Sequence, residues 1–235
     1  MSRPLDGQTA LVTGASRGIG AATAEALAAA GAHVILTART SGGLEEVEDR
    51  IHTNGGSATI APLDLTEAES IGRLAISVAG RWNSLDILVL NAAMLGSLGP
   101  VPHIDANEFA KLFTLNVSAQ QAMIAAFDPL LRRSAGAQII GLTSSVGQMP
   151  RAFWGAYGAS KAAFETLLSS YAEENKAIGR IKVAIIDPGA TRTQMRARAY
   201  PGEDVTTLKG PEIVANRIVT LLSEGFETGH RERVN

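Results

Sequence analysis

The chain has 235 residues, 46% hydrophobic and 19% charged, which is the balance of a soluble globular protein with a full core. Its formal net charge of -2 excludes a broad electrostatic attraction to nucleic acid or to anionic membranes. The absence of cysteine excludes disulfides, thiolate metal sites and a cysteine nucleophile, and is compatible with a reducing cytoplasm.

Short apolar runs alternate with helical patterns along the whole chain. Strands are expected at 9–13, 33–38, 58–63, 86–91, 138–143 and 182–186, with a weak seventh at 231–234. Helices are expected from the first glycine-rich turn to about 30, then at 44–54, 67–80, 105–133, 155–178 and 211–224, with a kink or break at Pro129. This alternation predicts a Rossmann-type doubly wound α/β fold, with six to seven parallel strands, helices on both faces and one domain over 1–235.

A glycine-rich turn, G-A-S-R-G-I-G, joins the first strand to the first helix. Gly14 permits the turn, while Gly18 and Gly20 let the backbone approach a phosphate and the helix approach the sheet. The helix N-terminus offers free N–H groups to a pyrophosphate. The spacing differs from G-x-G-x-x-G, but its place between strand and helix predicts a dinucleotide site.

The end of the second strand bears on which nucleotide is bound. A carboxylate there would contact the adenosine ribose 2′-hydroxyl, whereas a basic residue favours a 2′-phosphate. This chain has Ala38 followed by Arg39, and Arg17 lies in the glycine turn. These residues favour NADP(H) over NAD(H); the alternative is two solvated surface arginines.

Tyr157 and Lys161 are four residues apart in an expected helix and therefore share a face. An ammonium beside a phenol favours the phenolate and is expected to lower the tyrosine pKa from about 10. Such a tyrosine can exchange a proton near neutral pH. Ser144, at the end of the fifth strand, could hold a substrate oxygen at the same point. The alternative is an ordinary surface tyrosine and lysine.

Together these motifs resemble the short-chain dehydrogenase/reductase family, in its single-domain branch. The resemblance covers nearly the whole chain and is closest to a YciK-like group of bacterial members. The motifs stand in the family's order as T-G-A-S-R-G-I-G (13–20), Asp64-Leu65, L-N-A-A (90–93), Asn116, Ser144, Y-G-A-S-K (157–161) and P-G-A-T-R-T (188–193). The family's N-N-A-G reads L-N-A-A here, so Leu90 and Ala93 are departures.

The resemblance implies a role for each matching residue. Tyr157 would be the general acid/base, Lys161 would lower its pKa and bind the nicotinamide ribose, and Ser144 would hold the substrate oxygen. Asn116 would interrupt the long helix locally and position a water. The implied cofactor contacts are Gly14, Ser16, Arg17, Gly18, Ile19, Gly20, Arg39, Asp64, Leu65, Asn91, Ala92, Tyr157, Lys161, Pro188, Gly189, Thr191 and Thr193.

Two assignments have close rivals in the sequence. Ser145 is the alternative to Ser144, and Thr191 is the alternative to Thr193 as a nicotinamide contact. The segment 191–209 is expected to be a loop with at most one short helix. The substrate pocket is expected to include Met94, Ser145, Met149, Trp154 and Met195, a surface suited to an apolar or mixed substrate.

The sequence thus predicts an NADP(H)-dependent enzyme that interconverts a carbonyl and a secondary alcohol. Two alternatives are a non-catalytic NADP(H) sensor on the same fold and an enoyl reductase, whose relatives space the tyrosine and lysine more widely. The expected partners are a small-molecule substrate and further copies of the chain, as a homodimer or homotetramer, but no nucleic acid and no membrane. No secretory signal or metal-ligand spacing is seen in the sequence, so a cytoplasmic, metal-free protein is expected.

Overall fold

The computed structural model describes residues 3–235 and contains one sheet of seven parallel strands in the order β3-β2-β1-β4-β5-β6-β7. The strands are β1 (Thr9–Thr13), β2 (His33–Thr37), β3 (Ser57–Ile60), β4 (Ile87–Leu90), β5 (Ala137–Leu142), β6 (Ile181–Asp187) and β7 (His230–Arg233). The predicted doubly wound parallel fold is therefore confirmed, and the weak seventh strand is present.

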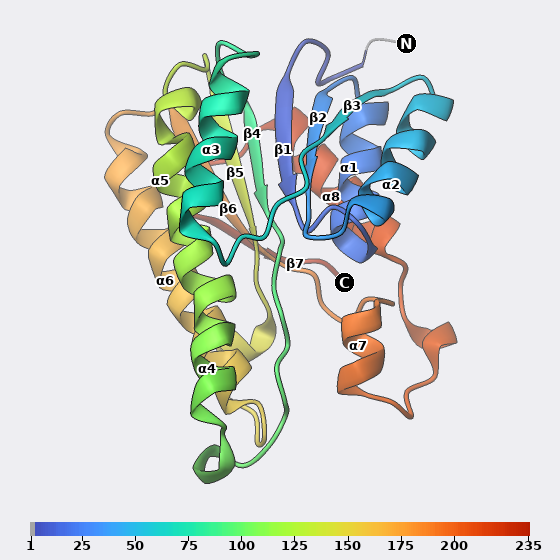
Figure 1. Cartoon of the computed structure of the whole chain (residues 1–235), viewed down its shortest axis with the longest axis vertical. Coiled ribbons are helices and arrows are strands. Elements are labelled where there is room, and N and C mark those ends of the chain that lie inside the picture. The colour runs from blue at the N-terminus through green and yellow to red at the C-terminus, as the bar shows by residue number, and fades with distance from the viewer. Residues whose placement is uncertain (1–2) are drawn as a thin grey trace.

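Helices cover both faces of the sheet (Figure 1). One face carries α1 (Gly18–Ala29), α2 (Ser41–Thr53) and α8 (Pro211–Glu224); the other carries α3 (Ala68–Ala79), α5 (Ala119–Leu131) and α6 (Gly155–Lys176). Two further helices, α4 (Ala106–Phe113) and α7 (Gln194–Ala199), lie beyond the ends of the strands. Short helical turns are η1 (Val101–His103), η2 (Thr114–Ser118), η3 (Ser145–Gly147) and η4 (Val205–Thr207).

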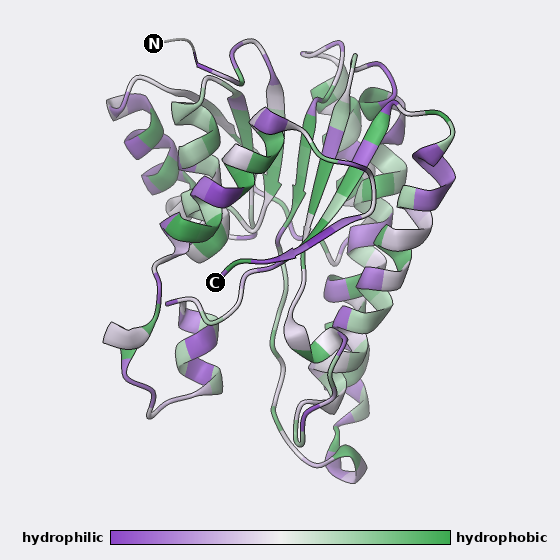
Figure 2. Cartoon of the chain, turned by 180° about the vertical axis from the view of Figure 1, so that it is seen from behind, coloured by the Kyte–Doolittle hydropathy of each residue, from purple (hydrophilic) through white to green (hydrophobic). Residues whose placement is uncertain are grey.

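Two apolar clusters, one on each face of the sheet, form the core. β1 shows how the strands divide between them, since Val12 is buried with α1 and α8 while Leu11 is buried with α3 and α5. Fully buried strands of this kind read as continuous apolar runs. Figure 2 shows the apolar strands inside a more polar helical layer, whereas the polar strand β7 stands at the edge.

The predicted break in the long helix is misplaced. The chain remains helical through Pro129 to the end of α5, because the proline lies in the last turn and removes only one helical hydrogen bond. The next turn continues, with the Arg132 N–H bonded to the Asp128 carbonyl at 2.9 Å. The regular α-helical pattern instead changes at η2, a π-helical turn centred on Asn116, as the family resemblance implied.

The strand order reverses between β1 and β4. From β1 the chain builds the sheet toward β3 at one edge, and from β4 it builds the sheet toward β7 at the other. In open parallel sheets, ligands bind in the crevice outside the carboxyl ends of the strands at this point. The loops that follow β1, β2, β3, β4, β5 and β6 all lie at that edge and contain most of the predicted site residues.

Candidate active site

The glycine turn after β1 forms a cradle at the start of α1. Gly14 and Gly18 have φ of 66° and 59°, a region that glycine adopts without steric cost. Arg17 occupies the N-cap position without a side-chain cap, and the first turn of α1 contains no acidic residue. The N-terminus of α1 is therefore electrostatically suited to an anion.

Gly20 explains how α1 approaches the turn so closely. A Cβ atom at this position would overlap the carbonyl oxygen of Gly14 and would lie 2.5 Å from the Asn91 side-chain nitrogen. Only glycine fits there without movement of the backbone. The predicted role of Gly20 in close packing is consistent with this geometry.

Thr13 and Asn91 brace the crevice between β1 and β4. The Thr13 hydroxyl accepts hydrogen bonds from the backbone N–H groups of Asn91 and Ala92, at 2.9 and 3.0 Å, and donates to the Val89 carbonyl at 3.2 Å. The Asn91 side chain donates to the carbonyl of Thr13 at 2.8 Å. The Asn91 amide thus shapes the glycine turn from behind, a function the sequence did not reveal.

The loops after β1 and β2 place Arg17 and Arg39 near a second helix N-terminus, that of α2. Arg39 and Arg17 are exposed, and neither has an ion-pair partner among residues 3–235. A Cβ atom on Gly43, in the first turn of α2, would lie 3.0 Å from the Cβ of Ser16, so this turn adjoins the glycine turn. The first turn of α2 also has no acidic residue, which leaves a basic, N–H-rich corner.

Asp64 follows β3, with Leu65 buried behind it. One carboxylate oxygen accepts from the backbone N–H and the hydroxyl of Thr66, at 2.9 and 2.7 Å. These bonds, with a smaller contribution from the charge of Arg39, hold the pKa of Asp64 below its usual range. The bonds in the structure involve only Oδ1, so Oδ2 stands available for a ligand.

Tyr157 and Lys161 are both buried on α6, one turn apart. The Lys161 ammonium lies 5.8 Å from the centre of the Tyr157 ring, and it donates to the Leu142 carbonyl at 2.8 Å. Burial lowers the pKa of Lys161 to about 8, against the opposing charge of Glu165.

The expected lowering of the Tyr157 pKa is not what the structure shows. Burial raises the pKa of Tyr157, and the negative charge of Asp187 raises it further. The Lys161 ammonium is hydrogen-bonded to a backbone carbonyl at the end of β5. Within this chain the phenol is therefore held protonated at neutral pH.

Ser144 and Ser145 follow the fifth strand and are both half-buried. The carbonyl of Ser144 accepts from Gly147 N–H at 2.9 Å, and that of Ser145 accepts from Met149 N–H at 2.8 Å. Their backbones thus form the tight turn η3, which packs against the start of α6. Ser144 occupies the extended N-cap position of that turn, and its hydroxyl is not used as a cap.

Asn116 is buried within the π-helical turn and clamps the loop after β4. Its Oδ1 accepts from the backbone N–H of Met94 at 2.9 Å, and its Nδ2 donates to the Met94 carbonyl at 2.9 Å and to the Ser160 hydroxyl at 3.0 Å. Ser160 donates in turn to the Tyr157 carbonyl at 2.8 Å. The amide therefore links the loop after β4 to the helix that carries Tyr157 and Lys161.

Apolar and aromatic side chains surround the Tyr157 hydroxyl. The Met195 sulfur lies 3.9 Å from that hydroxyl, and the Trp154 ring meets the Tyr157 ring edge-on at 6.0 Å. Tyr200, which the sequence interpretation missed, stacks at 5.7 Å on Trp154 and is hydrogen-bonded to Arg151. Trp154 and Met195, both expected in the substrate pocket, thus lie beside the tyrosine.

Met149 does not share that environment. Its side chain is 64% exposed, whereas the apolar cluster around Tyr157 is built from Leu95 and Val146. Met149, also expected in the substrate pocket, lies outside this cluster, and its side chain is directed toward solvent. Met94 is half-buried, and its backbone is held by Asn116.

The segment after β6 turns at Pro188 and Gly189, which has a φ of 62°. Thr191 is buried, and its hydroxyl donates to the Pro188 carbonyl at 2.9 Å. Thr193 caps α7 by accepting from Arg196 N–H at 3.1 Å, and its methyl group would lie 3.6 Å from a Cβ atom on Gly18. Of the two threonines, Thr193 is therefore the one that faces the glycine turn.

The described chain carries no group of three or more His, Asp or Glu side chains arranged to hold a metal ion. Across residues 3–235, no helix combines the length and the apolar character that a membrane crossing requires.

The fold and these motifs define the class of protein. The family model for short chain dehydrogenase matches residues 8–204, so the chain belongs to the short-chain dehydrogenase family.

Individual relatives are similar over most of their length. The uncharacterised oxidoreductase YciK of Escherichia coli (strain K12) is 37% identical over 210 residues, which cover 88% of this chain and 82% of that protein. A short chain dehydrogenase structure from Pseudomonas syringae has a TM-score of 0.96 and 38% identity, covering 100% of this chain and 97% of that one. A structure from Shigella flexneri 2a, complexed with NADP, has a TM-score of 0.95 and 34% identity, covering 100% of this chain and 99% of that one.

Proposed function

We propose that the chain is an NADP(H)-dependent oxidoreductase that interconverts a carbonyl and a secondary alcohol. The observation that carries this proposal is the pairing of buried Tyr157 and Lys161 on α6, at the sheet edge that also carries the glycine turn. Burying a phenol and an ammonium lowers the stability of the folded chain. Their presence beside a crevice therefore favours a chemical role. Membership of the oxidoreductase family agrees with that role.

The residues present fit a dinucleotide with a 2′-phosphate. The uncapped N-terminus of α1 would receive the pyrophosphate, and Gly14 and Gly18 leave room for its approach. Arg39 and Arg17, beside the first turn of α2, would bind the 2′-phosphate through charge-assisted hydrogen bonds. The Shigella flexneri relative, complexed with NADP, supports the same choice.

Other residues of the crevice would contact the remaining parts of the dinucleotide. Asp64 would contact the adenine, because one of its carboxylate oxygens accepts no hydrogen bond from residues 3–235. Thr193, which faces the glycine turn, would contact the nicotinamide end. When bound, NADPH supplies the hydride, and the protein supplies orientation and a proton.

Tyr157 would act as the general acid in the reductive direction. Its raised pKa keeps the phenol protonated at neutral pH, which is the form that can donate a proton to a carbonyl oxygen. Lys161 would bind ribose hydroxyls and favour the phenolate left after transfer, because it is positively charged below a pH of about 8. Ser144 would hold the substrate oxygen, as its hydroxyl is not used to cap η3.

NADPH consumption, followed by absorbance, tests the proposal against a panel of ketones, diketones, quinones and β-ketoacyl thioesters. We expect reduction of at least one carbonyl, with NADPH preferred to NADH. Tight binding of NADPH without turnover of any compound would contradict the proposal and favour a nucleotide sensor. Reduction confined to conjugated C=C bonds would contradict it in favour of an enoyl reductase.

A further inference from the structure

Glu165 is a buried carboxylate on α6, one turn beyond Lys161, that has no part in the chemistry described above. Its side chain is 6% exposed. It accepts hydrogen bonds from the Thr143 hydroxyl, from Gln148 Nε2 at 3.1 Å and from Arg231 Nη1 at 2.8 Å. Two of these donors belong to the 143–148 segment and the third belongs to β7, so the carboxylate joins two parts of the fold to α6.

Two of the donors flank the segment that contains Ser144. Thr143 immediately precedes that serine, and Gln148 follows the turn η3. Gly147, in the same turn, approaches so closely that a Cβ atom there would lie 2.9 Å from Glu165 Oε1. The 143–148 segment is therefore held against α6 at both of its ends by one side chain.

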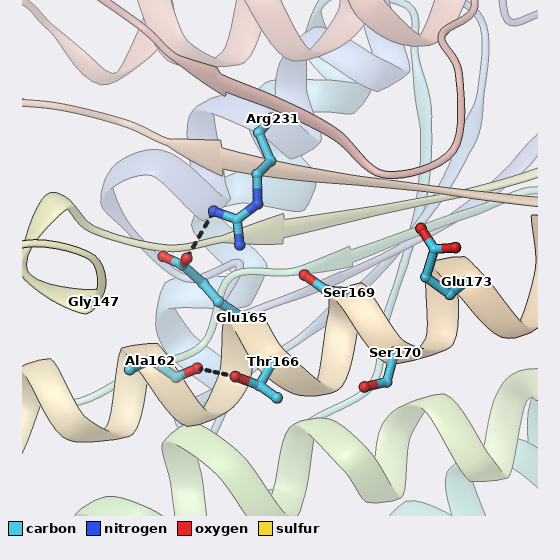
Figure 3. A pocket seen from close by; sticks show the side chains of 8 residues that line it. All are labelled: Gly147, Ala162, Glu165, Thr166, Ser169, Ser170, Glu173 and Arg231. Carbon is cyan, nitrogen blue, oxygen red and sulfur yellow. Dashed lines mark hydrogen bonds and ion pairs between the residues drawn. The ribbon is translucent and has the colours of Figure 1, made fainter.

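The third donor belongs to the last strand of the sheet. Arg231 reaches from β7 across the end of β6 to α6, beside a cavity of about 610 Å³ (Figure 3). Thr166, Ser169 and Glu173 of α6 also line this cavity, and the Arg231 side chain is 39% exposed. Solvent thus has access to the guanidinium, whereas the carboxylate that it neutralises is enclosed.

A buried carboxylate that loses its cation is strongly destabilised, and it either takes up a proton or draws its neighbours out of place. In this chain the neighbours are the residues on either side of Ser144. Lys161, on the preceding turn of α6, also attracts this carboxylate electrostatically, but its ammonium is hydrogen-bonded to the Leu142 carbonyl. Arg231 is the cation that is hydrogen-bonded directly to the carboxylate, so its loss would reach the serine.

We propose that Arg231 and Glu165 form a positioning pair through which β7 holds the 143–148 segment against α6. The pair thereby keeps the Ser144 hydroxyl in place relative to Tyr157. Its catalytic consequence rests on the proposed function, whereas its structural consequence does not. Neither residue touches substrate or cofactor in this role. The pair acts through the hydrogen bonds that Thr143 and Gln148 donate to the Glu165 carboxylate.

The test uses Arg231→Ala in the full-length chain, with Arg217→Ala as a matched control. Arg217 forms a two-pronged ion pair with Glu232 of the same strand, at 2.6 and 2.8 Å, but ties β7 to α8 instead of α6. We expect Arg231→Ala to lower kcat by about 10-fold to 100-fold, the range for a misplacement of about an ångström, with the KM for NADPH changed less than about twofold. Arg217→Ala should lose stability similarly but keep its kcat.

Chemical rescue separates lost positioning from general damage. Guanidinium chloride at millimolar concentration should enter the cavity beside Glu165 and restore much of the Arg231→Ala activity, whereas sodium chloride at equal ionic strength should not. Arg231→Lys, which keeps the charge, should be impaired less than Arg231→Ala. Equal losses of kcat in the Arg231 and Arg217 variants, or an absence of rescue, would overturn the proposal while leaving the proposed function intact.

Amide hydrogen exchange supplies a readout that needs no turnover. We expect faster exchange over 143–149 in Arg231→Ala than in Arg217→Ala, with guanidinium reversing the difference. Equal exchange in the two variants would overturn the positioning role even if no substrate were found. Faster exchange with no turnover by the wild-type chain would uphold the role and count only against the proposed function.

Discussion

At the scale of single residues, Lys161 shows that sequence spacing predicts which side chains are neighbours but not how the folded environment shifts their pKa values. Spacing places it near Tyr157, and the structure agrees, but the ammonium bonds to a backbone carbonyl and burial dominates the pKa of both groups. Desolvation depends on the whole surrounding fold, so no local pattern could have revealed its size. The resulting cost to folding can be measured.

The buried ammonium predicts a specific pH dependence of stability. Because the folded pKa of about 8 is below the unfolded value of 10.5, the penalty of about 3 kcal/mol is complete below a pH of about 8. It falls as the pH rises from about 8 to 10.5, since the folded chain then binds fewer protons than the unfolded one. Relative to Lys161→Met, the wild-type chain should gain about 2 kcal/mol between about pH 7 and pH 9.5 in urea unfolding. Parallel pH profiles for the two proteins would contradict this prediction.

At the scale of secondary-structure elements, apolar periodicity predicted most of the strands and helices. Where an observed element is shorter than expected, as β3 is, the cause is physical. β3 ends before Pro62, which has no N–H for the ladder. Ala61 still donates to Leu36 of β2 at 2.8 Å, and Leu63 donates to Ala38, just after β2, at 2.9 Å.

Contacts between distant segments could not be predicted in the same way. Glu165 precedes Arg231 by 66 positions, and the sequence offers only its place four residues after Lys161 as a signal. The clamp between Asn116 and Met94 depends likewise on the loop after β4 folding back over η2. Family motifs pointed to the interruption of the helix at Asn116, but the bonds that its amide makes required coordinates.

The space around two helical glycines predicts opposite effects of substitution on stability: Gly20 is enclosed where α1 approaches the glycine turn, and Gly72 is not. Gly20→Ala should destabilise the chain by about 1–3 kcal/mol, because the new methyl group meets the Gly14 backbone. Gly72→Ala, in the middle of α3, has open space and should stabilise by about 0.4–1 kcal/mol. Chemical denaturation of both variants checks the difference. A Gly20→Ala protein as stable as Gly72→Ala would refute the close approach.

At the scale of the whole molecule, the proposed cofactor would contact loops from both halves of the sheet, which come together only in the folded chain. A ligand that binds only the folded state stabilises it by about 2.7 kcal/mol at a concentration of 100 Kd. For a chain of this size that gain corresponds to a rise in Tm of about 5–10 °C.

Thermal unfolding should therefore show a larger Tm rise with NADP(H) than with NAD(H) at equal concentration. A variant with Ala38→Asp and Arg39→Ala should reverse this order, because the carboxylate would bind the ribose 2′-hydroxyl and repel a 2′-phosphate. Its unliganded Tm provides the control for stability. An unchanged order in that variant would show that the 2′-phosphate is bound elsewhere.

The central claim is that Tyr157 exchanges a proton with the substrate beside a bound NADP(H). Its most direct test is the steady-state turnover of Tyr157→Phe with a carbonyl that the wild-type chain reduces, measured together with the Kd for NADPH. Loss of the phenol hydroxyl should lower kcat by about 10²-fold to 10⁴-fold, the value of a positioned acid or base, and should leave the Kd within about twofold. Turnover near the wild-type rate in Tyr157→Phe would contradict the account.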